Sequence, residues 1–276
     1  MTDQPLKGVK VIDFGIHAAG SACGKVLADW GADVIKVESL GGCPTRLSGK
    51  MLGLSCDPGH NIHYEMLNGN KRSIAVNMKT PEGREIMERL LAEANIFFSN
   101  FRMSALRRMG LYYESVSLRH PHLIWGHVSG YGEEGAQSGD PGFDVVCYWA
   151  RTGLLMDIAE KDTLPTTGPI GIGDLNTGAS MAGALAACLY QQLKTGRGQK
   201  VMNSLYGTAV WTIGSEVQST RHGDGYPRSR RNATSPLINT YRCRDGVWMV
   251  MCAMDYGRFL PVLCEMIGRT ELAEDP

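Results

Sequence analysis

One glycine-flanked aspartate stands out among the residues that could do chemistry. Asp174 lies in the stretch 171–178, which reads Gly-Ile-Gly-Asp-Leu-Asn-Thr-Gly. Gly171 and Gly173 permit backbone conformations that other residues avoid and let a substrate approach the main chain closely. A helix of small residues is expected from about Asn176, so free backbone N–H groups and the helix dipole should favour the ionised form of Asp174. An ionised, accessible carboxylate can act as a nucleophile.

The same local pattern also fits a purely structural role. Aspartate is among the preferred N-cap residues, so Asp174 could simply cap the helix that starts near Asn176. The local pattern favours neither interpretation, and the rest of the chain has to decide between them.

Composition excludes several classes of function. The 276 residues carry 28 basic and 28 acidic side chains, so no global charge points to nucleic acid or to a membrane surface. The eight cysteines form no C-x-x-C pair and residues 1–9 are polar, which predicts reduced thiols in a cytoplasmic protein. The apolar run Gly178–Tyr190 is too short for the roughly 20 residues of a membrane helix. No histidine group has metal-ligand spacing, so we expect no metal.

Strand-like and helix-like segments alternate along the first 220 residues. The segments that read as strands are 9–14, 34–37, 96–98, 123–128 and 200–203. Thr80-Pro81-Glu82 is a strong helix start, and further helices are expected over 141–150 and from Asn176 to Leu193. The glycines and alanines of that last helix should allow very close packing against a neighbour. The alternation predicts an α/β fold with a doubly wound, Rossmann-like parallel sheet.

The remaining residues predict a second, smaller domain. Residues 1–220 form the expected large domain, and the arginine-rich segment 221–235 reads as a linker. In residues 236–276, Asp245-Gly246 between two apolar runs indicates a hairpin, and a helix follows. The α+β small domain is therefore expected to be incomplete within this chain.

Basic residues gather where the predicted strands end. Asn70–Ser73 and Lys79 flank one strand, and Asn100–Arg102 follow another, with Arg107 and Arg108 close behind. Ligands of open parallel sheets bind beyond the carboxyl ends of the strands. These side chains could hold the phosphates of a large anionic ligand, although solvated surface charge is the commoner role for any one of them.

The first strand–helix turn gives only half of a dinucleotide fingerprint. Gly15–Gly20 lacks the G-x-G-x-x-G spacing, whereas Glu38 stands where such a site places its ribose-binding acid. The turn can still present backbone N–H groups to an anion at the helix start.

Several stretches, taken together, resemble the class III CoA-transferase family, which includes the formyl-CoA and carnitine CoA-transferases. They are 6–14, 27–38, 70–74, 79–83, 100–102, 195–199 and the aspartate motif 173–178. The resemblance extends over essentially the whole chain. Pro141–Asp144 and Asn232–Pro236 look most like members that act on 2-hydroxy acids and their unsaturated counterparts.

The resemblance implies a covalent mechanism with coenzyme A as a substrate and no permanently bound cofactor. Asp174 would attack the thioester carbonyl of an acyl-CoA to give an aspartyl anhydride, and the CoA thiolate would then convert the aspartate into a CoA thioester. An acceptor carboxylate would take the CoA by the reverse exchange. Gly171 and Gly173 would give the acyl group access and offer N–H donors to an oxyanion. Asp144 matches an acidic position that could orient the bound acid.

The resemblance also implies where coenzyme A binds. The matching positions are Ala18, Ala19, Asn77, Met78, Lys79, Asn100, Phe101, Arg102 and Arg108. Ser39 stands where a relative has arginine, which removes one phosphate contact. Ala18 replaces a polar residue of the formyl-CoA enzyme, which argues against the same small substrate.

Two other functions remain open from the sequence. Racemases of this fold place a histidine base where this chain has Phe143, which disfavours proton exchange at the α-carbon. Family members form interlocked homodimers and extend well beyond this length, so we expect a fragment or a shortened variant. A non-catalytic CoA-binding subunit is therefore the other alternative.

Overall fold

The computed structural model describes residues 4–57 and 60–274. They form two compact units: one runs through Leu155 and resumes over Thr167–His222, and the other combines Met156–Thr166 with the described residues from Gly223 onward. Residues 156–166 thus cluster with the second unit, although the sequence reasoning assigned them to 1–220. Among the described helices, none is both long and apolar enough to cross a membrane.

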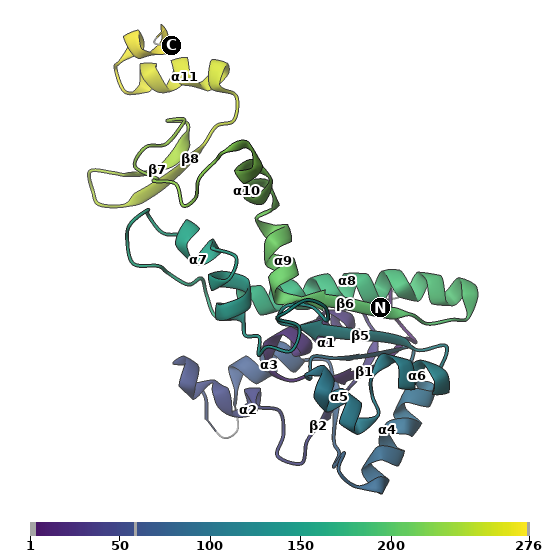
Figure 1. Ribbon diagram of the computed structural model, residues 1–276. Helices are drawn as coiled ribbons and strands as arrows, with labels where there is room; N and C mark the ends of the chain where they lie inside the picture. The colour runs from purple at the N-terminus through teal and green to yellow at the C-terminus, as the bar shows by residue number, and fades with distance from the viewer. Residues whose placement is uncertain (1–3, 58–59, 275–276) are drawn as a thin grey trace. The chain divides into compact units, whose positions relative to one another are not determined.

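A six-stranded parallel sheet forms the centre of the first unit, in the order β3-β2-β1-β4-β5-β6 (Figure 1). The strands are β1 (Lys10–Phe14), β2 (Asp33–Glu38), β3 (Arg72–Ala75), β4 (Ile96–Ser99), β5 (Ile124–Ser129) and β6 (Lys200–Ser204). Chain order reverses between β1 and β4, where Val11 lies opposite Val34 on one side and Ile96 on the other. The predicted doubly wound α/β sheet is confirmed, and this reversal is where such sheets bind ligands.

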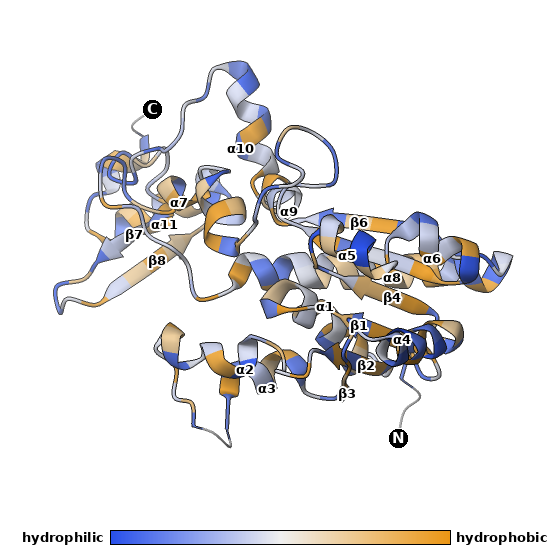
Figure 2. Cartoon of the chain, turned by 60° about the horizontal axis from the view of Figure 1, so that its bottom comes forward, coloured by the Kyte–Doolittle hydropathy of each residue, from blue (hydrophilic) through white to orange (hydrophobic). Residues whose placement is uncertain are grey.

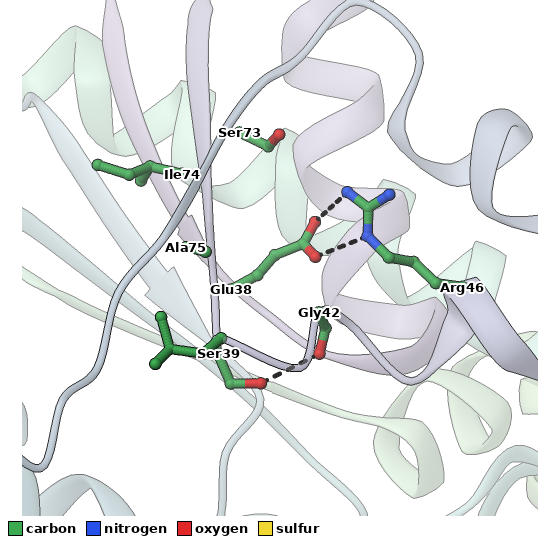
Figure 3. A pocket seen from close by; sticks show the side chains of 8 residues that line it. Glu38, Ser39, Gly42, Arg46, Ser73, Ile74 and Ala75 are labelled. Carbon is green, nitrogen blue, oxygen red and sulfur yellow. Dashed lines mark hydrogen bonds and ion pairs between the residues drawn. The ribbon is translucent and has the colours of Figure 1, made fainter.

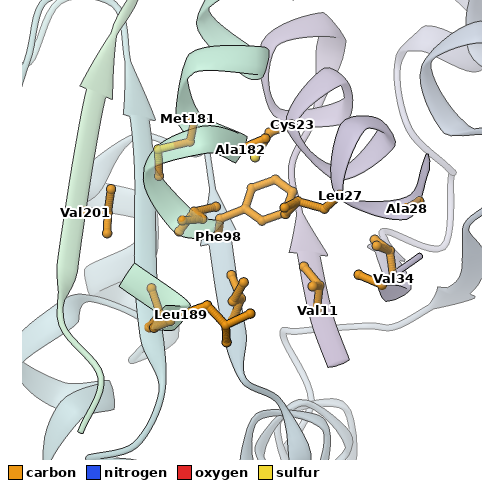
Figure 4. Close-up of a cluster of buried hydrophobic side chains, with 14 of the residues drawn as sticks. Val11, Cys23, Leu27, Ala28, Val34, Phe98, Met181, Ala182, Leu189 and Val201 are labelled. Atoms are coloured by element: carbon orange, nitrogen blue, oxygen red, sulfur yellow. The ribbon is translucent and has the colours of Figure 1, made fainter. Parts of the chain in front are cut away.

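Helices cover both faces of the sheet. One face packs against α1 (His17–Asp29) and α8 (Ile172–Thr195), and the other against α4 (Pro81–Glu93), α5 (Met103–Met109) and α6 (Tyr113–Arg119). Figure 4 shows the first of these cores, in which Leu27 of α1 and Met181 of α8 meet Phe98 of β4. Hydrophobic residues follow the strands, whereas α4 is largely hydrophilic outside its buried stripe (Figure 2).

The small residues of α8 are used against α1, as their composition predicted. A methyl group built on Gly178 would lie 2.8 Å from the carbonyl oxygen of Ala19 and 2.7 Å from the Cβ of Ala22. The two backbones therefore approach as closely as glycine allows. This contact fixes the first turns of α1 and α8 against each other.

Local sequence signals place several boundaries correctly. The Thr80 hydroxyl accepts a hydrogen bond from the Gly83 N–H (3.2 Å), as an N-cap should. The expected helix over 141–150 is wrong in extent and type, because residues 141–143 are not helical and Val145–Ala150 form a π-helix, η2. Gly142 instead packs its backbone directly on Gly130, which holds the chain before η2 in an irregular conformation.

The remaining elements of the first unit are short. They are α2 (Thr45–Ser48), η1 (Lys50–Leu52), α3 (Ile62–Asn68), α9 (Leu205–Thr212), α10 (Gly214–Ser219) and η3 (Thr220–His222). A further helix, α7 (Leu154–Asp157), spans the boundary between the units.

The second unit contains the predicted hairpin and helix. Strands β7 (Ile238–Arg242) and β8 (Trp248–Cys252) pair antiparallel, and α11 (Tyr256–Met266) and η4 (Thr270–Glu274) follow. Gly246 has a φ of 87°, which explains the glycine at the turn. Leu237, Leu260 and Cys264 form its small core. Glu160 joins residues 156–166 to this unit by accepting hydrogen bonds from Ser229 and Arg230.

Candidate active site

Asp174 lies inside the first turn of α8. The helix begins at Ile172, and Gly171 is its N-cap with a φ of 75° and no side-chain cap. The predicted start near Asn176 is therefore wrong, and so is the alternative that Asp174 caps the helix. The cause is Gly171, whose left-handed backbone ends the preceding loop four residues earlier than the sequence pattern suggested.

A second carboxylate approaches Asp174 from the start of η2. Asp144 is only 8% exposed, and its Oδ1 atom has no hydrogen-bond partner among the described residues. A methyl group on Gly173 would collide with Asp144 Oδ1 and with the ring of Tyr148. The space next to Gly173 is therefore filled by the protein, whereas the sequence analysis expected this glycine to admit the acyl group.

The environment of Asp174 makes its ionisation unfavourable. Burial, and secondarily the negative charge of Asp144, raises the pKa of Asp174 to about 7. Burial also raises the pKa of Asp144. The expectation that the helix start favours an ionised Asp174 is thus wrong, because desolvation and the like charge outweigh it. Near neutral pH the side chain exists in both forms, and perturbed carboxyl groups of this kind cluster at functional sites.

Hydrogen bonds join the two strand ends at the topological reversal. Asn100 Oδ1 accepts from the Ile16 N–H and Asn100 Nδ2 donates to the Ile16 carbonyl, both at 2.7 Å. The sequence analysis expected Asn100 to contact CoA; each polar atom of its side chain makes one hydrogen bond within the protein and keeps capacity for a second, so that contact stays a prediction. Asn100 also fixes the loop that follows β1.

The basic residues at the start of β3 form ion pairs with aspartates of the same unit. Lys71, with a side chain only 1% exposed, lies 2.8 Å from Asp13 Oδ2, and Lys36 Nζ lies 3.7 Å from Asp13 Oδ1. Arg72 pairs with Asp33. These residues are therefore not available for phosphates, contrary to the expectation drawn from charge alone.

The three cations of the predicted CoA set remain available at the carboxyl edge of the sheet. Lys79 follows β3, Arg102 follows β4 and Arg108 lies in α5; all three are exposed and form no ion pair within the described part of the chain. Asn77 is exposed next to Lys79 and accepts a hydrogen bond from its N–H (3.2 Å). These are the predicted CoA positions whose polar groups reach solvent.

The apolar members of the predicted CoA set are partly or fully buried. Phe101 stacks on Phe14 with ring centroids 4.7 Å apart, and Met78 packs against the same core. Ala18 and Ala19 are 7% and 4% exposed, so their side chains belong to the α1 packing. At these two positions only the backbone of the first helical turn could face a ligand.

A hollow of about 200 Å³ opens where β2 and β3 end (Figure 3). Arg46 Nε and Nη2 bind the two oxygens of Glu38 at 2.8 and 3.0 Å, and the Tyr64 hydroxyl and the Cys43 N–H donate to the same carboxylate. Burial raises the pKa of Glu38, but these donors outweigh it and hold the pKa below its usual range. Glu38 is thus a structural carboxylate rather than a free ribose-binding acid.

Sequence reasoning missed two groups that support the site. The Tyr148 hydroxyl accepts from Asn176 Nδ2 (3.1 Å) and lies 3.0 Å from Thr212 Oγ1, which links η2 to α8. His127 holds the Phe101 carbonyl (2.9 Å). Tyr148 stands four residues after Asp144, a spacing that would have placed both on one helical face. No local signal identifies the partner of His127.

The profile of CoA-transferase family III matches residues 6–276. The chain belongs to this family. The match covers the whole sheet, the aspartate motif and the second unit, and it confirms the resemblance drawn from separate motifs.

Two relatives of this chain are named for reactions of 2-hydroxy acids or of related acids. The chain is 38% identical to the (R)-2-hydroxy-4-methylpentanoate CoA-transferase of Clostridioides difficile, covering 98% of this chain and 68% of the relative. It is 35% identical to the cinnamoyl-CoA:phenyllactate CoA-transferase of Clostridium sporogenes, covering 97% and 66%. The chain thus spans about two thirds of the length of these relatives.

A solved structure shares the fold. A CaiB/BaiF family protein from Brucella suis aligns with a TM-score of 0.84 at 30% identity, over 99% of this chain and 72% of that one.

Proposed function

We propose that this chain transfers coenzyme A from an acyl-CoA to a carboxylic acid, with Asp174 as the covalent nucleophile. The observation that carries the proposal is a half-buried aspartate with a pKa of about 7, beside a buried second carboxylate, at the start of α8 in a family III CoA-transferase chain. A carboxyl group titrating near neutral pH can be both nucleophile and leaving group.

The proposed reaction conserves the energy of the thioester. The ionised Asp174 attacks the acyl-CoA carbonyl, the C–S bond breaks, and an acyl-aspartyl anhydride and CoA thiolate form. The thiolate attacks the aspartyl carbonyl and releases the first acid, which leaves Asp174 as a CoA thioester. The acceptor carboxylate then repeats these two steps in reverse and leaves as acyl-CoA, which regenerates the aspartate.

The substrate acid is proposed to be a 2-hydroxy acid or its unsaturated counterpart. This rests on the two relatives named for 2-hydroxy-4-methylpentanoate and for cinnamate and phenyllactate. Phe143, which is 60% exposed immediately before Asp144, offers an apolar surface suited to a branched or aromatic side chain.

Coenzyme A is proposed to lie along the carboxyl edge of the sheet. Lys79, Arg102 and Arg108 would hold its phosphates, and the hollow beside Glu38 would take its nucleotide end. We further infer a cytoplasmic homodimer without a resident cofactor. Exposed apolar side chains such as Trp211 (85%) and Trp248 (67%) support a partner surface, and all eight cysteines are free.

The test is to trap the aspartyl intermediate. The protein is incubated with 4-methylpent-2-enoyl-CoA, treated with hydroxylamine and digested for mass spectrometry, with a sample lacking acyl-CoA as the control. A hydroxamate at Asp174 is the expected result. Unmodified Asp174 together with no movement of CoA between acids contradicts the proposal, and deuterium uptake at the α-carbon without such movement indicates a racemase instead.

The acylation rate is expected to rise with pH around an apparent pKa of about 7, because only the carboxylate attacks. Asp144→Asn removes the neighbouring negative charge, so the rise should move to lower pH. Single-turnover acylation measured from about pH 5 to 9 checks this. Asp140→Asn, at an exposed aspartate, should leave the profile in place. An unmoved profile in Asp144→Asn would show that Asp144 does not control the nucleophile.

Removing the free cations is expected to weaken CoA binding rather than the chemistry. Lys79→Ala and Arg108→Ala should each raise the KM for acyl-CoA by about tenfold, the effect of one charge-assisted contact, with little change in kcat. Arg72→Ala is the matched control, because that exposed arginine is already paired with Asp33. Equal KM values for all three variants would place the phosphates elsewhere.

A further inference from the structure

His17 is held in a strained backbone conformation at the carboxyl end of β1. Its φ of 55° lies in the left-handed region, which residues other than glycine seldom adopt. The preceding residues are fixed on both sides: Asn100 binds both backbone polar atoms of Ile16, and the Gly15 N–H donates to Asp13 (2.9 Å) while Lys36 donates to the Gly15 carbonyl (3.0 Å). Strain maintained by such surroundings is typical of functional positions.

His17 and Ala18 lie against the two segments that flank the carboxylate pair. The imidazole lies edge-on to Phe143 with ring centroids 5.9 Å apart, and Phe143 directly precedes Asp144. On the other side, a methyl group built on Gly171 would lie 4.0 Å from the Cβ of Ala18. His17 therefore contacts the residue before Asp144, and the next residue along the chain, Ala18, faces the glycine that begins the helix of Asp174.

The imidazole has unused hydrogen-bonding capacity. His17 is half-buried, and neither ring nitrogen has a hydrogen-bond partner within the described residues. Burial lowers its pKa, so the ring is neutral at neutral pH. A neutral imidazole offers one donor and one acceptor, which matches a hydroxyl group. A carboxylate would instead favour a cation.

We propose that His17 is a specificity-determining residue that hydrogen-bonds the 2-hydroxyl group of the substrate acid. This inference rests on the proposed function and assigns a residue to substrate recognition that family membership alone does not. The neighbouring Phe143 is an apolar ring, so His17 supplies the polar contact on this side of the nucleophile.

The test measures selectivity in direct competition. With 4-methylpent-2-enoyl-CoA as donor, equal amounts of 2-hydroxy-4-methylpentanoate and 4-methylpentanoate compete as acceptors, and mass spectrometry gives the ratio of the two acyl-CoA products; phenyllactate and 3-phenylpropanoate form a second pair. His17→Gly keeps the left-handed backbone and removes the ring. His17→Asn also tolerates this conformation and keeps a donor and an acceptor.

We expect the wild type to favour the hydroxylated acid and His17→Gly to lose that preference by about tenfold, the loss of one hydrogen bond. His17→Asn should retain most of it. If His17→Gly slows both acids equally and leaves the ratio unchanged, the inference is wrong while the CoA-transferase proposal stands. If the wild type forms neither product and no adduct on Asp174, both fail together.

Discussion

Asp174→Asn is expected to abolish the covalent intermediate and to lower CoA exchange between acids by about 10⁴-fold or more, the range seen when a nucleophile is removed. The amide has the shape of the carboxylic acid, so α8 and its contact with α1 should persist. It carries no charge, however, and cannot form an anhydride. Mass spectrometry of the trapped adduct and exchange of labelled CoA between two acids measure the two effects.

The same variant should be more stable than the wild type at alkaline pH. The folded-state pKa of Asp174, about 7, lies above its ordinary value of 3.8, so the folded protein binds this proton more tightly than the unfolded chain does. The free energy of unfolding of the wild type therefore falls as pH rises from about 4 through 7. The asparagine variant has no ionisable group at this position, so its free energy of unfolding does not fall for this reason. Urea unfolding at about pH 5 and pH 8 should show a gain only at the higher pH.

Together, the two results separate a functional aspartate from a structural one. A variant that is inactive and equally or more stable means that the fold tolerates Asp174 at a cost for the sake of chemistry. An active Asp174→Asn variant, purified free of other CoA-transferases, contradicts the proposed mechanism. A variant that unfolds would instead give Asp174 a structural role.

The parts of the fold that the sequence predicted are those with local causes. Thr80 caps α4 by accepting a hydrogen bond from Gly83, three residues later, and Gly246 forms the hairpin turn because its φ is positive. In both cases a short window of sequence contains all the residues that cause the structure. Val11 and Phe98 are apolar because the sheet is covered on both faces, which the alternating pattern also reveals. These signals were sufficient for a doubly wound sheet.

The parts that were wrong depend on partners distant in sequence. The sequence predicts Lys71 to be a surface cation, whereas in the structure it binds Asp13, which lies 58 residues earlier in the chain. Arg46 is not among the residues predicted for the site, yet it binds Glu38, eight residues earlier, and so makes that carboxylate structural. The raised pKa of Asp174 follows first from burial and then from the charge of Asp144, neither of which is local in sequence. Composition alone contains no information about these pairings.

The buried cluster around Asp13 gives the second large expected effect. Asp13 and Lys36 are fully buried, and Lys71 also donates to the Ser21 carbonyl (2.7 Å) and to Asn68 (2.9 Å). Asp13→Asn would leave two buried ammonium groups facing a neutral side chain. We expect a loss of about 3 kcal/mol in the free energy of unfolding, as for other buried ion pairs deprived of one partner.

The control is the same substitution in an exposed ion pair on the next strand. Asp33→Asn removes the partner of Arg72, whose side chain is 65% exposed, so it should cost between about 0 and 1 kcal/mol. Urea unfolding of both variants at neutral pH measures the difference. Equal, small losses would show that the two lysines are neutral or hydrated in the folded protein.

The pH dependence identifies the cause of the loss. Burial already lowers the pKa of Lys71 from its ordinary 10.5, and Asp13 partly restores it, so Asp13→Asn should lower it further. When the folded-state pKa of a lysine is lowered, the unfolded chain binds its proton more tightly than the folded protein does. The free energy of unfolding therefore rises with pH between the folded and the unfolded pKa. The deficit of Asp13→Asn should therefore shrink between about pH 7 and pH 9. A deficit that stays constant over this range would assign the loss to packing of the loop after β1 rather than to charge.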